Sequence, residues 1–248
     1  MSRKREHGFG IDIGGSGIKG APVDLTSGKL AADRIRIPTP QPSTPEAVAG
    51  TVAEILDAFD WKGSFGCTFP AVVQHGITRT AANVDASWVD CDAGSVLRKV
   101  TGRDALLVND ADAAGVAEVE FGAAGAASGV VLLATLGTGI GTAVISHGHL
   151  VPNTELGHLE IDGHDAESRA ADSAREREDL SWEEWGGRLT RYFQHVENLL
   201  WPDLIVVGGG VSKKFDKWSP YVSTRTPMVP AKLLNEAGII GAALLAHD

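Results

Sequence analysis

Two glycine-rich segments of similar design constrain the fold more than any other feature of the chain. Each places a short apolar run before a cluster of glycines and a second strand-like run after it; the segments are Asp12–Gly20 and Thr135–Thr142. This pattern is typical of a β-hairpin with a glycine turn. Because the segments lie in opposite halves of the chain, the repeat favours two similar lobes that face one another. A chance similarity in a sequence rich in alanine and glycine is the alternative.

Strand-like and helix-like segments alternate around the two glycine turns, and this alternation predicts an α/β fold. Thr44 and Pro45 have the residue types preferred at a helix N-cap and at the first helical position. The expected strands are residues 64–69, 105–108, 129–134 and 204–207, and the expected helices are residues 45–59, 111–121, 183–201 and 238–246. The polar stretch 162–179 is interpreted as a surface excursion.

The first glycine turn formally matches the dinucleotide-binding pattern GxGxxG through Gly15, Gly17 and Gly20. That fingerprint requires a helix directly after the glycines. Here Pro22 and an alternating strand pattern follow instead, so a nicotinamide site is disfavoured. A phosphate-binding hairpin fits better, because residues without a Cβ atom let backbone N–H groups approach an anion. A purely structural tight turn is the alternative.

Charged residues flank this turn. Lys19 would add positive charge near terminal phosphates, and Asp12 could hold a hydrated Mg²⁺ that bridges them. The phosphate-binding residues predicted here are Asp12, Gly14, Gly15, Ser16, Gly17 and Lys19.

Asn109 and Asp110 follow the apolar run 105–108, so we expect them at the carboxyl edge of a sheet, where α/β proteins bind ligands. A carboxylate at that position can accept the proton of a substrate hydroxyl that attacks phosphorus, while Asn109 holds a neighbouring hydroxyl. The alternative is that Asp110 is the N-cap of a helix that begins at Ala111.

Six motifs taken in order resemble the ROK family of sugar kinases, which belongs to the actin-like ATPase superfold. They are Asp12–Lys19, Phe69–Val73, Asn109–Asp112, Leu136–Gly141, Glu155–His158 and Val207–Ser212. The resemblance implies an α/β protein with two lobes that close over a cleft. The small lobe would comprise residues 1–108 and about 236–248, and the large lobe residues 109–235.

The resemblance also implies roles for individual residues. Asp110 would be the general base. The sugar-binding residues would be Asn83, Asn109, Asp110, Glu155, His158 and Glu167, and the second lobe would bind the donor through Thr138, Gly139, Gly209 and Gly210. Most members carry a cysteine-rich zinc segment after the Gly-His pair, whereas this chain has none, so no zinc is expected. Glu160 remains the alternative to Glu167 as the glutamate that binds the sugar after this segment.

Because it is short, lacks the zinc segment and carries these motifs, the chain resembles the actinobacterial kinases of this family. Those kinases use polyphosphate or ATP to phosphorylate the 6-hydroxyl of glucose, and some of them also accept mannose. In a chain with a net charge of −10, a late group of cations is a candidate patch for polyphosphate. Its members are Lys213, Lys214, Lys217 and Arg225. An ordinary solvated face is the alternative interpretation.

Composition and order exclude other classes. The net charge argues against a general nucleic-acid binder, and no apolar run is long enough to span a bilayer, so we expect a cytoplasmic protein. The family resemblance implies a homodimer. One rival is an ATP-only kinase for another hexose, such as mannose or an N-acetylated amino sugar. A second is a sugar-responsive repressor, disfavoured because the first motif begins at Asp12 and leaves no room for a helix-turn-helix segment.

Tryptophans on the expected helix 183–201 or beside it, namely Trp182, Trp185 and Trp201, are interpreted as core or dimer contacts. Trp88 and Trp218 lie in loop-like sequence and are candidates for the edge of a cleft. Arg175 stands among acidic residues and is interpreted as a surface charge.

Overall fold

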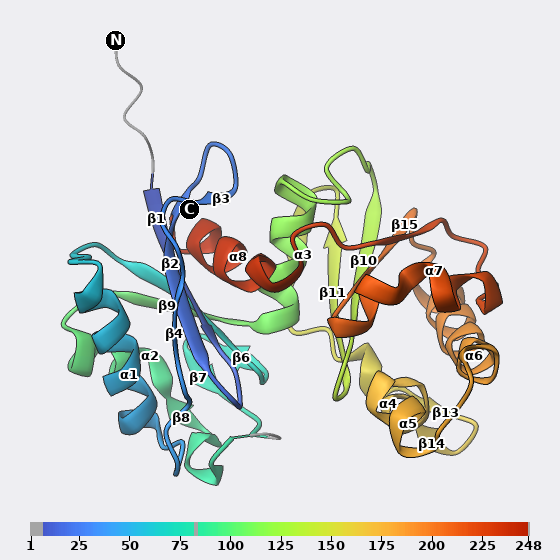
Figure 1. Ribbon diagram of the computed structural model, residues 1–248, viewed down its shortest axis with the longest axis horizontal. Coiled ribbons are helices and arrows are strands. Elements are labelled where there is room, and N and C mark those ends of the chain that lie inside the picture. Colours follow the sequence, from blue (N-terminus) through green and yellow to red (C-terminus); the bar gives the residue numbers. More distant parts are fainter. Residues whose placement is uncertain (1–6, 82–83, 248) are drawn as a thin grey trace. The chain divides into compact units, whose positions relative to one another are not determined.

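The computed structural model describes residues 7–81 and 84–247. The chain divides into two compact units, Met1–Ala117 with Glu236–Asp248, and Glu118–Asn235. Each unit contains one main β-sheet with helices packed against it (Figure 1). The α/β class expected from the sequence is confirmed. The division falls within a helix, α3 (Asp110–Glu120), so Asn109 and Asp110 group with the first unit by their contacts.

The main sheet of the first unit has the strand order β3-β2-β1-β5-β9, and β4 also pairs with β2. The first two strands form an antiparallel hairpin, whereas β5 and β9 run parallel to β1. The strands are β1 His7–Ile13, β2 Ile18–Asp24, β3 Lys29–Leu30, β4 Ile35–Ile37, β5 Phe65–Phe69 and β9 Ala105–Asn109. A small sheet contains β6 Val73–Gln74, β7 Ile77–Thr78 and β8 Cys91–Asp92.

Helices cover both faces of this sheet. The first is α1 (Pro45–Ala58), which begins as predicted, because the Thr44 side chain accepts a hydrogen bond from the Ala47 N–H. The other helices are α2 Ala93–Thr101 and α8 Ala237–Leu245, with a short 3₁₀ turn at Ala86–Trp88. The C-terminal helix α8 lies directly on β1 (Figure 1), and a Cβ atom on Gly10 would stand 1.8 Å from the Ile239 carbonyl oxygen. Glycine is therefore required for this close approach.

The sheet of the second unit has the order β12-β11-β10-β15-β16, again with an antiparallel hairpin and a parallel neighbour. Its strands are β10 Val130–Leu136, β11 Ile140–Ser146, β12 His149–Val151, β15 Leu204–Gly208 and β16 Met228–Pro230. The long helix α6 (Trp182–Leu200) begins with a capping box formed by Ser181 and Glu184. It buries a stripe of large side chains in the same core as the inner strands.

Shorter elements complete the second unit. They are the hairpin of β13 Glu160–Ile161 and β14 His164–Asp165, the helices α4 Ala166–Ala170, α5 Asp172–Arg177 and α7 Phe215–Trp218, and 3₁₀ turns at Leu156–His158, Gly210–Lys214 and Ser219–Tyr221. A further 3₁₀ turn, Leu234–Glu236, lies where the chain passes from the second unit back to the first.

The interpretation of residues 162–179 as a surface excursion is correct for most side chains of this stretch, which are exposed, but it missed the helices and their buried alanines. This stretch contains α4 and α5, each of which buries alanines; α4 packs against α6, and the Trp185 indole N–H donates to the Ala170 carbonyl at 3.0 Å. The alanines fix the helices although the charged residues between them dominate the composition. The assignment of Trp88 and Trp218 to a cleft edge is wrong, because both side chains are fully buried in the two cores.

Across the described ranges, every helix falls short of the length and apolar character needed to cross a membrane.

Candidate active site

The first glycine turn is closed by its own backbone. The register of β1 and β2 pairs Asp12 with Lys19 and leaves the loop Gly14–Gly17, in which the Gly14 N–H donates to the Gly17 carbonyl at 3.2 Å. The Lys19 ammonium lies 3.0 Å from one Asp12 carboxylate oxygen, and the Thr68 hydroxyl donates to the other at 2.9 Å. A partly buried carboxylate and a cation therefore stand side by side at the base of the turn.

A second cation at this turn was missed by the sequence analysis. Arg36 lies on β4, opposite Lys19 in the strand register, and its guanidinium donates to the Ser16 carbonyl at 3.0 Å. The guanidinium covers Gly17 so closely that a Cβ atom there would stand 2.7 Å from it. No local pattern marks Arg36, because a three-residue strand becomes recognisable only through its pairing with β2.

Asn109, the last residue of β9, caps helix α3. Its side-chain oxygen accepts hydrogen bonds from the backbone N–H groups of Ala111 (2.9 Å) and Asp112 (3.1 Å), and its amide donates to the Ala71 carbonyl at 3.2 Å. Asp110 is the exposed first residue of the helix, and its carboxylate also accepts from the Ala111 N–H. Most of the capping considered for Asp110 is thus performed by Asn109.

The sugar-binding role expected for Asn109 stays a prediction, since its amide oxygen is engaged within the fold. Asn83, the other amide expected to contact the sugar, lies outside the described residues.

The second glycine turn carries a carboxylate of different origin. Between β10 and β11 the chain turns through Gly137–Gly139, with the Gly137 N–H donating to the Gly139 carbonyl at 3.0 Å. The Glu167 carboxylate, from α4, accepts a hydrogen bond from the Ile140 N–H at 3.0 Å. A Cβ atom on Gly139 would stand 2.3 Å from this carboxylate, so the glycine provides the space that Glu167 occupies. The Thr138 carbonyl accepts from the Ser173 hydroxyl.

The glycines after β15 reach the same edge of this sheet. Since β15 runs parallel to β10 with Gly208 opposite Thr135, both strands end side by side. Gly209 has a φ of +82°, and a Cβ atom there would stand 2.3 Å from the Leu136 carbonyl oxygen. The structure therefore brings together the predicted phosphate-binding residues of this unit, which are Thr138, Gly139, Gly209 and Gly210.

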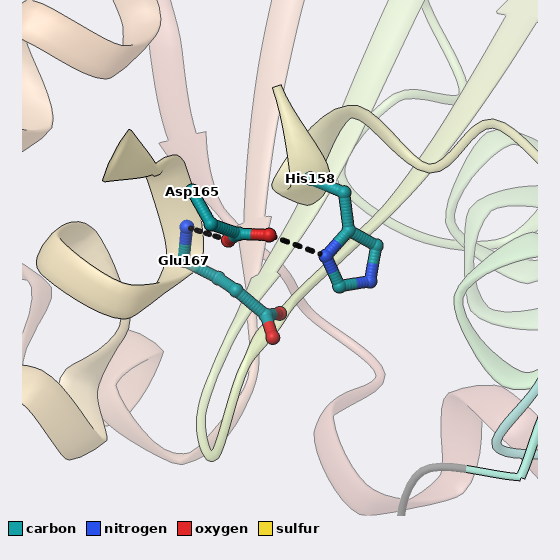
Figure 2. A group of neighbouring side chains, drawn as sticks. All are labelled: His158, Asp165 and Glu167. Atoms are coloured by element: carbon teal, nitrogen blue, oxygen red, sulfur yellow. Dashed lines mark hydrogen bonds and ion pairs between the residues drawn. The ribbon is translucent and has the colours of Figure 1, made fainter. Parts of the chain in front are cut away.

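His158, Asp165 and Glu167 form a polar cluster beside the turn (Figure 2). The His158 Nδ1 atom lies 2.9 Å from the Asp165 carboxylate, whose other oxygen accepts from the Glu167 N–H. The hydrogen bond to Asp165 raises the pKa of His158, and the charges of Glu167, Asp165 and Glu155 act in the same direction against partial burial. The sequence did not indicate Asp165, because this residue comes close to His158 only when the β13–β14 hairpin folds back on itself.

The cluster also bears on the choice between two glutamates. Glu160 is exposed on β13, whereas the carboxylate that lies within 4.8 Å of the His158 and Asp165 ligand atoms is that of Glu167.

The 3₁₀ turn that carries His158 begins just after Glu155 and is held by the Thr142 hydroxyl, which accepts from the Leu156 N–H at 3.1 Å.

A divalent cation could bridge the three ligand atoms of this cluster by distance alone. Its ligands would be nitrogen and oxygen, because Cys67 and Cys91 lie on β5 and β8 of the other unit. The expectation that zinc is absent stays a prediction.

The late cations separate into two groups. Lys213 and Lys214 lie in a 3₁₀ turn and Lys217 in α7, and all three are exposed. Arg225 lies elsewhere, stacked 3.9 Å from the Trp201 ring centre and donating to the Glu197 carbonyl at 3.0 Å.

The separation follows from the length of α6. The Lys214 ammonium lies 5.8 Å from the ring centre of Trp182, at the start of this helix, whereas Glu197 and Trp201 lie at its end. A helix of this length spans roughly 28 Å. Arg175 stacks 4.3 Å from the same Trp182 ring with its side chain only 15% exposed, so its interpretation as a surface charge is wrong.

Comparison with known proteins assigns the family. A model of the ROK family matches residues 8–171, about two thirds of the chain. The chain belongs to the ROK family. It is 53% identical to the polyphosphate glucokinase of Mycobacterium tuberculosis (strain CDC 1551 / Oshkosh), over 97% of this chain and 91% of that protein.

Two solved structures extend the comparison. The inorganic polyphosphate/ATP-glucomannokinase of Arthrobacter sp. strain KM superimposes with a TM-score of 0.91 and 53% identity, covering 97% of this chain and 98% of that one. A ROK family glucokinase from Streptomyces griseus, in complex with glucose and AMPPNP, has a TM-score of 0.81 at 20% identity and covers 98% of this chain and 99% of its own; at that identity it supports the fold alone. The ROK resemblance and the actin-like fold class expected from the sequence are confirmed.

Proposed function

We propose that the chain is a phosphotransferase that transfers the terminal phosphoryl group of inorganic polyphosphate or ATP to the 6-hydroxyl of glucose, giving glucose 6-phosphate. The observation that carries the proposal is the 53% identity, over nearly the whole chain, to proteins named for this acceptor and these donors. The site residues fit the reaction, because both sheets end in glycine turns at which backbone N–H groups can meet phosphate oxygens.

Asp110 is the proposed general base. The substrate hydroxyl oxygen forms a bond to the terminal phosphorus, the bond from phosphorus to the bridging oxygen of the donor breaks, and the hydroxyl proton passes to the Asp110 carboxylate. Its exposed place at the start of α3, with the capping largely done by Asn109, is compatible with contact to a substrate.

Positive charge and backbone N–H groups stabilise the transferred phosphoryl group. In the first unit these come from the loop Gly14–Gly17 with Lys19 and Arg36, and in the second from the Thr138 and Gly209 turns. Electrostatic stabilisation of this kind is most of what a phosphoryl-transfer enzyme supplies.

Asp12 is the proposed residue for Mg²⁺, held through water. Its two carboxylate oxygens each accept one hydrogen bond, from Lys19 and Thr68, and retain lone pairs, and hard oxygen ligands suit this ion. When bound, Mg²⁺ would offset charge on the donor phosphates.

Glucose hydroxyls would be held by Glu155, His158 and Glu167, as the family resemblance implies. Asp165 orients the His158 ring through Nδ1 and leaves Nε2 for the sugar. The Glu167 carboxylate keeps an oxygen for a hydroxyl after accepting from Ile140.

The polyphosphate chain would continue from the glycine turns over the lysines of the second unit, Lys213, Lys214 and Lys217, with Arg175 beside them. Arg225 would contribute little, because its guanidinium is stacked at the far end of α6. Because salt screens the attraction between these cations and the phosphates, binding of polyphosphate should weaken as the salt concentration increases.

The test is a coupled assay for glucose 6-phosphate, with ATP and long-chain polyphosphate as separate donors. Asp110→Asn should lower kcat by about 10²- to 10⁴-fold with both donors, because the proton acceptor is lost while the shape is kept. Glucose binding, measured by calorimetry, should stay near the wild-type value. Asp104→Asn, an exposed carboxylate just before β9, is the matched control and should be fully active. Near-normal turnover of Asp110→Asn with both donors would refute the assignment of the base.

Mannose is a second proposed acceptor, because the name of the Arthrobacter relative includes it. Its kinetics should be measured beside those of glucose, N-acetylglucosamine and N-acetylmannosamine. The expected homodimer and the cytoplasmic location stay predictions, to be checked by analytical ultracentrifugation and by cell fractionation.

A further inference from the structure

A cavity of about 320 Å³ in the second unit is lined by none of the residues assigned above. Its walls come from the β13–β14 hairpin, α4 and α6. Ile161, Ala166 and Ala170 supply apolar surface, and three arginines supply positive charge. Small-molecule sites combine concave apolar walls with a few convergent polar groups in this way.

Two of the three guanidinium groups already face a carboxylate. Arg188 lies 2.6 Å from Glu178, and Arg191 lies 2.7 Å from Asp162. Hydrogen bonds from Arg188 and Arg177 hold the pKa of Glu178 at about 2, so this carboxylate is ionised at neutral pH. These two lining arginines therefore contribute little net charge to the cavity.

Arg169, from α4, is different. Its guanidinium approaches the His164 Nε2 atom at 2.8 Å, and it forms no ion pair with any carboxylate in the residues 7–81 and 84–247. Since a guanidinium only donates, the His164 ring accepts this hydrogen bond. Arg169 thus brings an uncompensated positive charge and several N–H groups to the cavity.

The Tyr192 side chain, from α6, also lines the cavity and is 1% exposed. Within the described part of the chain its hydroxyl finds no hydrogen-bond partner. Burial raises the pKa of Tyr192 well above its usual range, so the group is a neutral O–H donor. A buried hydroxyl without a partner is unfavourable, and an acceptor oxygen of a ligand that reached it from this cavity would satisfy it.

We propose that this cavity binds a small organic phosphate. The phosphate group would meet the Arg169 guanidinium, whose planar fork matches phosphate oxygens. The body of the molecule would cover Ile161 and Ala166, and one of its oxygen atoms would accept from the Tyr192 hydroxyl. This binding site is separate from the proposed phosphoryl-transfer reaction, and binding there does not require catalysis.

The elements around the cavity also carry residues of the proposed sugar site. Helix α4 bears Glu167 and strand β14 bears Asp165, and both side chains reach the cluster around His158. A ligand in the cavity should therefore alter the KM for glucose. This consequence rests on the proposed function, whereas the binding itself does not.

The test uses phenyl phosphate as a probe, with inorganic phosphate and phenol as its two halves, in calorimetry at saturating glucose. Phenyl phosphate should bind at least about tenfold more tightly than either half, because it engages both the arginine and the apolar wall. Arg169→Gln should weaken its binding by about tenfold. Arg98→Gln, at an exposed arginine on α2, is the matched control and should bind as the wild type does.

Two further variants distinguish binding in this cavity from binding at the first glycine turn. Tyr192→Phe removes an unsatisfied hydroxyl, so the Tm without probe should stay equal or rise, while the Tm increase caused by phenyl phosphate should shrink. Lys19→Gln, at the first glycine turn, should leave probe binding unchanged. Unchanged binding in both Arg169→Gln and Tyr192→Phe, or loss of binding in Lys19→Gln, overturns the proposal. Because no step requires catalysis, failure of the Asp110 test leaves these results interpretable.

Discussion

The two glycine hairpins share a scaffold but differ in chemistry. Each consists of two seven-residue strands, and in each the first strand also pairs with a parallel neighbour. Counting back from the turn, Asp12 and Lys19 of the first hairpin correspond to Thr135 and Gly141 of the second. The ion pair of the first hairpin is thus replaced by a hydroxyl that donates to a carbonyl at 3.3 Å.

The difference extends to what covers each turn. Arg36 covers the first turn, whereas a carboxylate, Glu167, rests on the second. The first hairpin therefore suits the charged end of a phosphoryl donor. In the proposed reaction, the second joins the proposed phosphate-binding turn to the proposed sugar-binding cluster. A repeated scaffold can serve two ligands when only the side chains beside its turn differ.

The largest expected difference between the two hairpins tests their charge asymmetry. Asp12→Asn should lower kcat/KM for both donors on the order of 100-fold, because the carboxylate that pairs with Lys19 is lost at the phosphoryl site. Thr135→Val, the corresponding change in the second hairpin, should cost less than about threefold, since one neutral hydrogen bond is removed. Steady-state kinetics on both variants checks this, and equal losses would mean that the hairpins do not differ in role.

A smaller effect is expected at the second turn. Gly139→Ala places a methyl group where the Glu167 carboxylate lies, and should raise the KM for glucose by about tenfold through a lost charged hydrogen bond. Gly137→Ala has open space around the new methyl group and serves as the control. A glucose KM that stays at the wild-type value in Gly139→Ala would separate Glu167 from the sugar.

The smallest expected effect is a pH dependence of the free energy of unfolding that comes from the pair of His158 and Asp165 beside the second hairpin. Asp165 raises the pKa of His158, so the pair stabilises the fold fully below the unfolded histidine pKa near 6.5 and loses this contribution as pH rises through the raised folded value. Asp165→Asn should therefore lower the free energy of unfolding below that pH, by under about 1 kcal/mol because the pair is exposed.

Urea denaturation of wild type and Asp165→Asn at pH 5.5 and pH 8.5 measures this difference. The gap between the two proteins should narrow at the higher pH. A gap that widens with pH would contradict the assigned direction of the His158 shift.

Local patterns predicted much of the fold because the interactions that decide it are local. The Thr44 cap, the glycine turns and the start of α6 depend on residues that are neighbours in the sequence. The family resemblance supplied roles for residues such as Asp110 and His158 that their neighbours alone left open.

Other features failed prediction for a common reason. Polar composition suggested exposure for residues 162–179, and most of these side chains are exposed, yet alanines at helical spacing in α4 and α5 are buried. Trp88 stands in loop-like sequence and is nevertheless buried, where its indole donates to the Ser43 carbonyl at 2.7 Å. Burial of this kind depends on partners distant in the chain.

The sequence by itself determined the paired hairpins, the α/β class and the order of the motifs, because strand periodicity and glycine turns are encoded within a few residues. Only the tertiary structure placed Arg36 over the first turn, set Asp165 against His158, chose Glu167 over Glu160 for that cluster and separated Arg225 from the lysines. Each of these contacts joins elements that meet through strand pairing or helix packing. Their geometry is fixed when the core forms, and a linear pattern does not contain it.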